Sequence, residues 1–228
     1  MPRVNPLVEP IADSALALDR RAIAAGATGT VGHPDADTFV YVASGAGELE
    51  LGDVRRALAA RSAALVLAGE EAKVAARDDL ELVVVSVGSD VDRHAPMGRR
   101  ELVTSLDDAE AQQATGARSF QILFDANNGS TRATLFAGFV PPGRAPWHYH
   151  LYDEIVWVPD GPGRLHIGEK TEELGTSSAF RLRPREVHIV ENTSTDRELT
   201  IIGIFTPAGS PSAAYLTPDV AAECRFAG

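Results

Sequence analysis

The feature that most constrains the fold of this chain is an internal repeat. Residues 26–47 align with residues 143–163 at an offset of 117, with one residue of drift. Residues 66–76 then align with residues 182–192 at an offset of 116. Self-similarity of this kind is typical of one structural unit that occurs twice along a chain. We therefore expect two copies of the same small domain.

Short apolar runs separated by turn residues indicate that each copy consists of β-strands. The chain has 20 Gly and 14 Pro, and they are spread along its whole length. Turn-forming residues spaced in this way between short apolar runs are typical of all-β proteins. The expected strands lie at residues 37–43, 48–52, 63–67, 80–87, 119–124, 131–140, 155–159, 164–168, 180–183, 187–191 and 198–205.

One short helix is expected between the two copies, at residues 106–115. Ser105 is a suitable N-cap, acidic residues follow in the first turn, and Gly116 suits the C-terminal end. We therefore predict an all-β fold of two consecutive β-barrels, residues 1–95 and residues 96–228, with this short linker helix between them.

Charge and cysteine content exclude several classes of partner and site. Acidic side chains outnumber basic ones by 32 to 21, which gives a formal net charge of −11. Such a field repels nucleic acids and anionic lipid surfaces, so we expect neither as a partner. Cys224 is the single cysteine, which excludes an internal disulfide and thiolate-rich zinc sites. Without an apolar span or leader pattern, the chain is expected to be cytoplasmic.

Two histidines and a glutamate close together in the sequence indicate a metal site. His148, His150 and Glu154 are all even-numbered, so the two-residue period of a strand points their side chains to one face. His188, in a later strand, supplies a third imidazole. Three neutral nitrogens and one oxygen suit a divalent transition metal. The sequence therefore predicts one such ion.

The same residues form two motifs, through which the chain resembles the cupin superfamily in its duplicated, bicupin form. The first motif reads Gly143, four residues, His148-Tyr149-His150, three residues, Glu154, six residues and Gly161. The second reads Pro184, three residues, His188, three residues and Asn192. Its usual glycine is missing, and the gap between proline and histidine is one residue short.

The resemblance implies two tandem antiparallel jelly-roll barrels and a single divalent metal in the second barrel. The implied ligands are His148, His150, Glu154 and His188. Fe or Mn is the favoured ion, and Zn or Ni is the alternative. Through the repeat, the ligand positions correspond in the first barrel to Val31, His33, Asp37 and Ala72. Because two of these cannot coordinate, we predict that the N-terminal barrel is metal-free. Barrel edges often pair between subunits, so we also expect a homodimer.

Three residues at or near the predicted metal site are candidates for binding or catalysis of a substrate. Tyr152 shares the even-numbered face, where its hydroxyl would orient a substrate or its ring would fill the barrel mouth. Glu154 is also a candidate to accept a substrate proton. His166 is a candidate proton carrier, and its alternative role is that of a half-buried scaffold residue.

Three arginines alternate along the strand before His188, and Arg183 is the one predicted to bind substrate. If their common face is interior, they would hold a carboxylate beside the metal. If it is exterior, which we favour because Phe180 and Leu182 compete for the interior, they would pair with acidic residues.

Residues 210–215 are expected to form an extended tail on the outside of a barrel.

The leading functional hypothesis is a mononuclear metal enzyme that acts on a small organic and sometimes anionic molecule. By resemblance, an oxygen-dependent dioxygenase is the favoured class. One alternative is non-oxidative chemistry, by an isomerase, lyase or hydrolase of a sugar acid or ureido compound. Another is a protein that uses the metal to bind a small molecule without turning it over.

Overall fold

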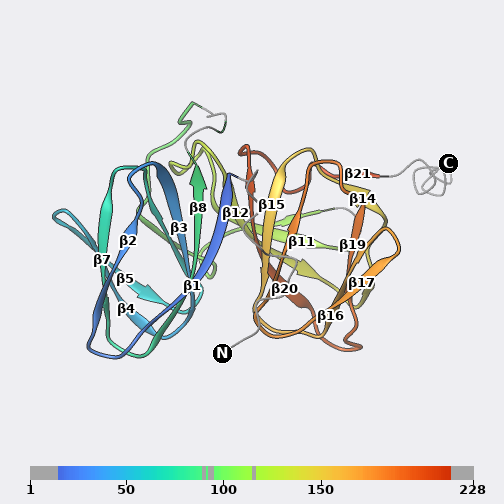
Figure 1. Ribbon diagram of the computed structural model, residues 1–228, viewed down its shortest axis with the longest axis horizontal. Coiled ribbons are helices and arrows are strands. Elements are labelled where there is room, and N and C mark those ends of the chain that lie inside the picture. The colour runs from blue at the N-terminus through green and yellow to red at the C-terminus, as the bar shows by residue number, and fades with distance from the viewer. Residues whose placement is uncertain (1–14, 89–90, 92–94, 115–116, 217–228) are drawn as a thin grey trace.

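The computed structural model describes residues 15–88, 91, 95–114 and 117–216, and all of its regular structure is antiparallel β-sheet. Two jelly-roll barrels lie side by side, as Figure 1 shows, and each is formed by two sheets. None of the described residues belongs to a helix with the length and hydropathy that a membrane span requires.

The first barrel contains the strands up to residue 105. Its five-stranded sheet has the order β1-β8-β3-β6-β9, and its four-stranded sheet has the order β2-β7-β4-β5. The bounds are β1 Leu16–Ile23, β2 Thr28–Gly32, β3 Ala36–Ser44, β4 Ala46–Leu51, β5 Val54–Ala59, β6 Ser62–Val66, β7 Glu71–Ala76, β8 Leu80–Gly88 and β9 Val103–Ser105. Strand β9 lies beyond the expected boundary at residue 95, yet it pairs with β6 of the first barrel.

The second barrel repeats this plan with more strands. Its six-stranded sheet has the order β10-β11-β12-β20-β15-β18, and the facing sheet has the order β17-β16-β19-β14-β21, with β13 also paired to β19. The bounds are β10 Ala111–Gln113, β11 Ser119–Phe124, β12 Thr134–Val140, β13 Gly143–Arg144, β14 His148–Tyr149, β15 Asp153–Val158, β16 Gly163–Ile167, β17 Lys170–Leu174, β18 Ser178–Leu182, β19 His188–Asn192, β20 Leu199–Thr206 and β21 Tyr215–Leu216.

The expected linker helix is wrong at residues 106–114, and its last residue, 115, lies outside the described residues. Every expected strand overlaps an observed one. Ser105 does bind the following turn, through its side-chain oxygen and the amide of Asp107 at 3.2 Å. The chain then leaves the turn and pairs as β10 with β11. Gln121 of β11 donates its side-chain amide to the carbonyl oxygens of Leu106, at 3.2 Å, and Ala109. Tertiary hydrogen bonds therefore take the place of helical ones, which propensity alone cannot foresee.

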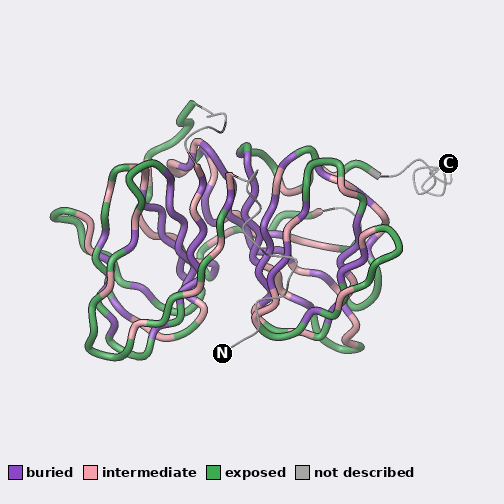
Figure 2. Tube along the Cα trace, viewed as in Figure 1, coloured by how far each residue is buried: buried purple, intermediate pink, exposed green. Residues whose placement is uncertain are grey.

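The largest apolar core lies between the barrels, where two sheets pack back to back. Figure 2 shows buried residues gathered along this contact. Equivalent residues of the two copies meet there: Tyr41 and Trp157, at an offset of 116, have ring centroids 5.9 Å apart. Five such pairs surround one small gap, namely Leu18 with Leu135, Phe39 with Ile155, Tyr41 with Trp157, Val83 with Ile202, and Val85 with Ile204. The two barrels thus contact each other through equivalent residues, as the subunits of a two-fold symmetric dimer do, although both belong to one chain.

Strand pairing also corrects one position of the repeat alignment. Val31 pairs with Ala72 as His148 pairs with His188, so these positions do correspond. However, Glu154 pairs with Leu182, and Thr38 pairs with Val66. Each residue of the second pair lies 116 positions before its counterpart in the first pair. The counterpart of Glu154 is therefore Thr38 and not Asp37, because the residue of drift lies before this strand.

The shift by one residue places Asp37 on the outer face of β3, toward the second barrel. There it accepts hydrogen bonds from Arg132 Nη1 at 3.2 Å and from the amide of Ala68 at 2.9 Å. Arg132 is 2% exposed, so this ion pair is removed from water. Asp37 thus connects the two barrels.

We predict that Arg132→Ala lowers the free energy of unfolding by about 3–5 kcal/mol, because it leaves the Asp37 carboxylate buried without its guanidinium. The double variant Asp37→Leu with Arg132→Met should recover most of that loss, since an apolar pair needs no counter-charge. Urea denaturation measures both. Arg20→Ala, at the exposed pair Arg20–Glu81, is the control and should cost far less. An equal loss in both single variants would contradict the structural role of Asp37.

Candidate metal centre

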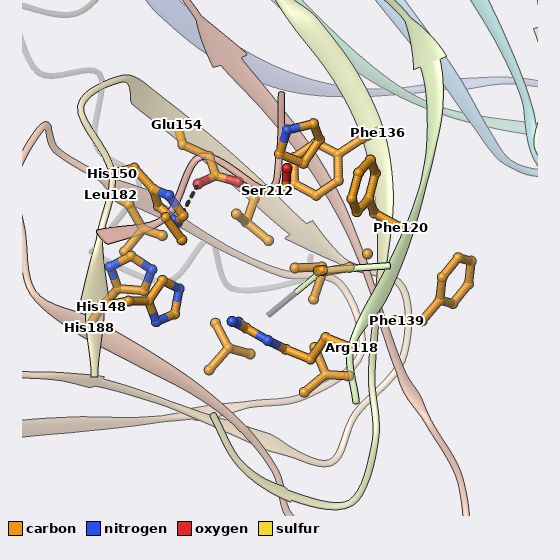
Figure 3. A pocket seen from close by; sticks show the side chains of 18 of the residues that line it. Arg118, Phe120, Phe136, Phe139, His148, His150, Glu154, Leu182, His188 and Ser212 are labelled. Atoms are coloured by element: carbon orange, nitrogen blue, oxygen red, sulfur yellow. Dashed lines mark ion pairs between the residues drawn. The ribbon is translucent and has the colours of Figure 1, made fainter. Parts of the chain in front are cut away.

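Three histidines converge inside the second barrel. His148 lies on β14 and is paired in register with His188, the first residue of β19. His150 follows β14 by one residue, and ring centroids in this group are 4.4 to 5.1 Å apart. One nitrogen from each ring lies within 4.8 Å of the other two. Figure 3 shows the three rings facing one another at one side of a cavity. These are the three histidines that the spacing predicts.

Backbone carbonyls determine which nitrogen each ring presents. Nδ1 of His148 lies 2.8 Å from the carbonyl oxygen of Pro146, and Nδ1 of His188 lies 2.8 Å from that of Glu186. Nδ1 of His150 is 3.4 Å from the carbonyl oxygen of Ala213. Because a carbonyl only accepts, each Nδ1 carries the proton and each Nε2 keeps its lone pair. All three rings are therefore held in the tautomer that a metal needs.

The same three imidazoles are neutral near pH 7. Burial, followed by the neighbouring His188 and Arg118, lowers the pKa of His148 to about 2. Burial and the proximity of His188 lower the pKa of His150 to about 3, and burial lowers that of His188 to about 4. Protons consequently do not compete with a cation for these nitrogens at neutral pH.

Glu154, the fourth predicted ligand, extends from β15 beside His150 and lies outside the group of three mutually close histidine nitrogens. Its Oε2 lies 3.9 Å from Nε2 of His150, and the side chain is buried. Burial, with a further contribution from the charge of Asp153, raises the pKa of Glu154 to about 8. Gly203 on β20 makes room for it: a Cβ there would lie 2.9 Å from Glu154 Oε1 and 2.4 Å from the ring of Phe136. Three neutral nitrogens and one buried carboxyl group fit a divalent transition metal.

The turn before His188 explains how the shortened second motif still places this residue. The amide of Glu186 donates to the carbonyl of Arg183 at 3.0 Å, and Pro184 and Arg185 are the two central residues. Arg185 has a φ of 66°, in the region that type II turns require at this position and that glycine adopts most easily. Its amide donates to the carbonyl of His150 at 2.6 Å, which joins the two ligand segments. Arg185 therefore substitutes for the missing glycine.

The histidines and Glu154 line a cavity with a volume of about 70 Å³. Its other walls combine aromatic and aliphatic residues with one cationic side chain: Ala114, Arg118, Ser119, Phe120, Phe136, Gly138, Phe139, Val140, Tyr152, Val156, Leu182, Val190, Ile201, Pro211, Ser212 and Ala214. This volume has room for on the order of five water molecules, or for one organic molecule of a few heavy atoms. The site therefore suits a small ligand.

Arg118 brings a positive charge to this cavity, and sequence reasoning missed it. Its guanidinium extends toward His148 and His188 in Figure 3, and its charge contributes to lowering the pKa of all three histidines. It precedes β11 and has the same parity as Phe120, a core residue of the barrel interior. That parity is the signal which would have placed Arg118 inside.

Tyr152 lies in the cavity wall, between His150 and Phe205. Its ring stacks on His150 with centroids 4.5 Å apart and on Phe205 at 3.9 Å. Burial is the main reason why the pKa of its hydroxyl is well above the usual value. The hydroxyl is therefore a neutral donor at any physiological pH.

His166 and Arg183 are not brought to the cavity. His166 is on the outer face of β16, where its ring nitrogens lie 3.0 Å from Thr171 Oγ1 and 2.7 Å from Glu191 Oε2. Arg183 is exposed at the end of β18. Arg181, two residues before it, donates two hydrogen bonds to Asp153 at 2.6 and 2.7 Å on the outer face of the sheet. The arginines of this strand therefore face the exterior, as we favoured from the sequence, because Phe180 and Leu182 occupy the interior.

Comparison with known proteins agrees with this architecture. Residues 136–205 match the family described as a cupin domain. The chain is similar in structure to AerE from Microcystis aeruginosa, with a TM-score of 0.70, 16% identity and coverage of 85% of this chain and 88% of that one. A comparison with curated protein sequences gives no match.

Two further structures extend the likeness. A variant of oxalate decarboxylase from Bacillus subtilis has a TM-score of 0.74 at 14% identity, covering 93% of this chain and 74% of that one. A cupin 2 conserved barrel domain protein from Leptotrichia buccalis has a TM-score of 0.59 at 15% identity, covering 84% and 83%. Residues 136–205 of the second barrel thus match a cupin domain, and the three solved structures share the fold of the chain.

We predict that binding of Mn²⁺ releases about one proton at pH 6.5 and about a quarter of one at pH 8.5, because the proton is lost from Glu154, with its pKa of about 8. The histidines contribute none, since they are already neutral. Calorimetric titration in buffers of different ionisation enthalpy counts the protons. Glu154→Gln is the control and should release none. Absence of proton release at pH 6.5 in the native protein would contradict the protonated state of Glu154.

We also predict that Arg185→Gly leaves the free energy of unfolding within about 1 kcal/mol of the native value and retains Mn²⁺ binding, since glycine accepts a positive φ. Arg185→Val should cost more than about 1–2 kcal/mol and weaken Mn²⁺ binding, because a β-branched residue is strained there and would displace His188. Thermal unfolding and metal titration of both variants test this. Equal behaviour of the two variants would show that the turn does not position His188.

Proposed function

We propose that this protein is a mononuclear divalent-metal enzyme that acts on a small carboxylate. The observation that carries the proposal is the convergence of three neutral imidazoles, the Glu154 carboxyl group and the Arg118 guanidinium on one small cavity. A metal site alone would suit many ligands. The guanidinium, however, selects an anion, because it donates paired hydrogen bonds that match the geometry of a carboxylate.

In this proposal His148, His150, Glu154 and His188 hold the ion, and Mn or Fe is favoured over Zn or Ni. Oxalate decarboxylase of Bacillus subtilis, which has this fold, is described with Mn(II) centres. A divalent ion would supply a Lewis acid that polarises a bound substrate oxygen. The ion would belong to the second barrel alone: the corresponding positions of the first barrel are Val31, His33, Thr38 and Ala72, and apolar side chains fill its interior.

The other cavity residues orient the substrate and exclude water. Arg118 binds a substrate carboxylate from the wall opposite Phe136 and Glu154 in Figure 3. Tyr152 is held between two rings and donates its hydroxyl hydrogen to a substrate oxygen. Phe120 and Phe136 make the remaining wall apolar, which strengthens each electrostatic contact inside the cavity. Once metal binding has removed its own proton, the Glu154 carboxylate accepts a proton from the substrate.

Two reaction classes fit this arrangement. We favour an oxygen-dependent dioxygenase reaction of the carboxylate substrate. Decarboxylation without net oxidation is the second candidate, and the shared fold with oxalate decarboxylase is the specific observation in its favour. Metal-loaded protein and small carboxylates, beginning with oxalate, separate the two by simultaneous measurement of oxygen uptake and carbon dioxide release. Saturable binding with neither signal would instead indicate a binding protein.

We predict that Arg118→Met raises the Kd of oxalate for the Mn²⁺-loaded protein by about 10- to 100-fold, because a charged hydrogen-bond donor is lost from a buried site. Its Mn²⁺ content should remain that of the native protein. His188→Ala should lose stoichiometric Mn²⁺ while the barrels stay folded. Elemental analysis and calorimetry measure the two effects. If Arg118→Met binds oxalate as tightly as the native protein does, Arg118 is not the anion anchor.

A further inference from the structure

The segment at residues 210–216, here called the C-terminal strap, forms part of the cavity wall. The expectation of a tail on the outside of a barrel is wrong, because Pro211, Ser212 and Ala214 line the cavity. The strap ends in β21, which pairs with β14 at Leu216 with His148 and at Tyr215 with Tyr149. It therefore lies directly against the strand that carries the first predicted ligand.

The strap is attached firmly at its start and lightly beyond it. At Gly209, which precedes it, the amide and the carbonyl both bind Thr134 Oγ1, at 3.0 and 2.9 Å. Inside the strap, the amides of Ala213 and Ala214 donate to strap carbonyls. Among the described residues, the one hydrogen bond from the middle of the strap to the barrel is that of His150 Nδ1 with the carbonyl of Ala213, at 3.4 Å.

The far end of the strap depends on a short edge strand. Within the part of the chain that the structure describes, β21 has two residues, is the last strand of its sheet and pairs with β14 alone. Tyr215 is 45% exposed and stacks on Tyr149 with ring centroids 5.4 Å apart. The other cavity walls include β12, β15 and β19, which have a neighbour on both sides. Of the cavity walls that the described residues form, the strap is thus the one that separates from the barrel at the smallest loss of hydrogen bonds.

We propose that the C-terminal strap is the gate of the cavity, which opens by release of β21 from β14 and pivots at Gly209. When it closes, the carbonyl of Ala213 returns to His150 and holds this ring in the tautomer that presents Nε2 to the cavity. Ala213 is therefore a positioning residue for His150. The inference deepens the proposed function, on which it rests for the role of the metal.

A reversible lock on the strap tests the gate. Tyr149 and Tyr215 are direct partners in an antiparallel pair, whose Cα separation suits a disulfide. In a Cys224→Ser background, Tyr149→Cys with Tyr215→Cys should form one on oxidation. Diethyl pyrocarbonate modification of His148 and His150 in the metal-free protein, followed by peptide mass spectrometry, reports access to the cavity. The rate should fall at least tenfold in the oxidised form and recover on reduction.

The release of Mn²⁺ to a chelator is the second readout and should slow by a similar factor in the oxidised form. Tyr215→Ala needs no disulfide and should accelerate both processes at least threefold. The matched control is Glu50→Cys with Arg55→Cys in the same background, a paired position of the first barrel that is remote from the cavity. Its oxidation should change neither rate.

Equal modification rates in the oxidised and reduced strap variants, together with a native rate in Tyr215→Ala, would overturn the gate. This outcome does not depend on metal binding. A protein that binds no Mn²⁺ but still shows the oxidation-dependent modification rate would keep the gate and refute the proposed metal enzyme. The two proposals therefore fail separately.

Discussion

Burial on both faces of the two central sheets is the constraint on which the rest of this structure depends. In each barrel, one face of the sheet that contains β3 or β15 lines the barrel interior, and the other face packs against the second barrel. Because successive side chains of a strand alternate, a shift of one residue exchanges the two sets. Thr38 and Glu154 therefore lie inside their barrels, while Asp37 and Asp153 lie outside and bind arginines. In each barrel, the residue at the position of Glu154 and the aspartate of the outer ion pair are therefore neighbours in the sequence.

Within the second barrel, burial also determines the charge of the candidate metal centre. It keeps the three imidazoles neutral and the Glu154 carboxyl group protonated near pH 7, in the absence of an ion. Backbone carbonyls then orient the rings without adding further titratable groups. The result is a set of donors that is arranged for a cation before one binds. Arg118 adds a positive charge to the cavity wall.

The two barrels share a fold and differ in what fills them. Valine, leucine and alanine side chains fill the first, which contributes packing energy and a broad apolar surface to the contact between barrels. The second gives up part of that packing for a polar cavity, at the usual cost of unfilled interior volume. The back-to-back contact of equivalent residues offsets this cost because it buries the outer faces of both large sheets. The well-packed first barrel thus stabilises the second barrel, which contains the cavity.

Much of this organisation could be predicted from the sequence, because it depends on local periodicity. The repeat predicted two copies, the spaced apolar runs predicted the strands, and the parity of His148, His150 and Glu154 predicted that they share a face. Propensity failed at residues 106–115, where pairing of β10 with β11 and the side chain of Gln121 replaced a helix. The helix was predicted from local signals alone, whereas the conformation of this segment depends on Gln121, which binds the carbonyl of Leu106 from 15 residues away.

The sequence by itself therefore determined the strand alternation, the duplication and the residue types that can hold a metal. Only the tertiary structure decided that Arg118 and the C-terminal strap line the cavity, that Asp37 bridges the barrels, and that Arg185 replaces a glycine in the turn before His188. The physical reason is that side-chain direction follows from the period of one strand. Which strands lie beside one another, and in which register, depends on hydrogen bonds and packing between segments far apart in the chain.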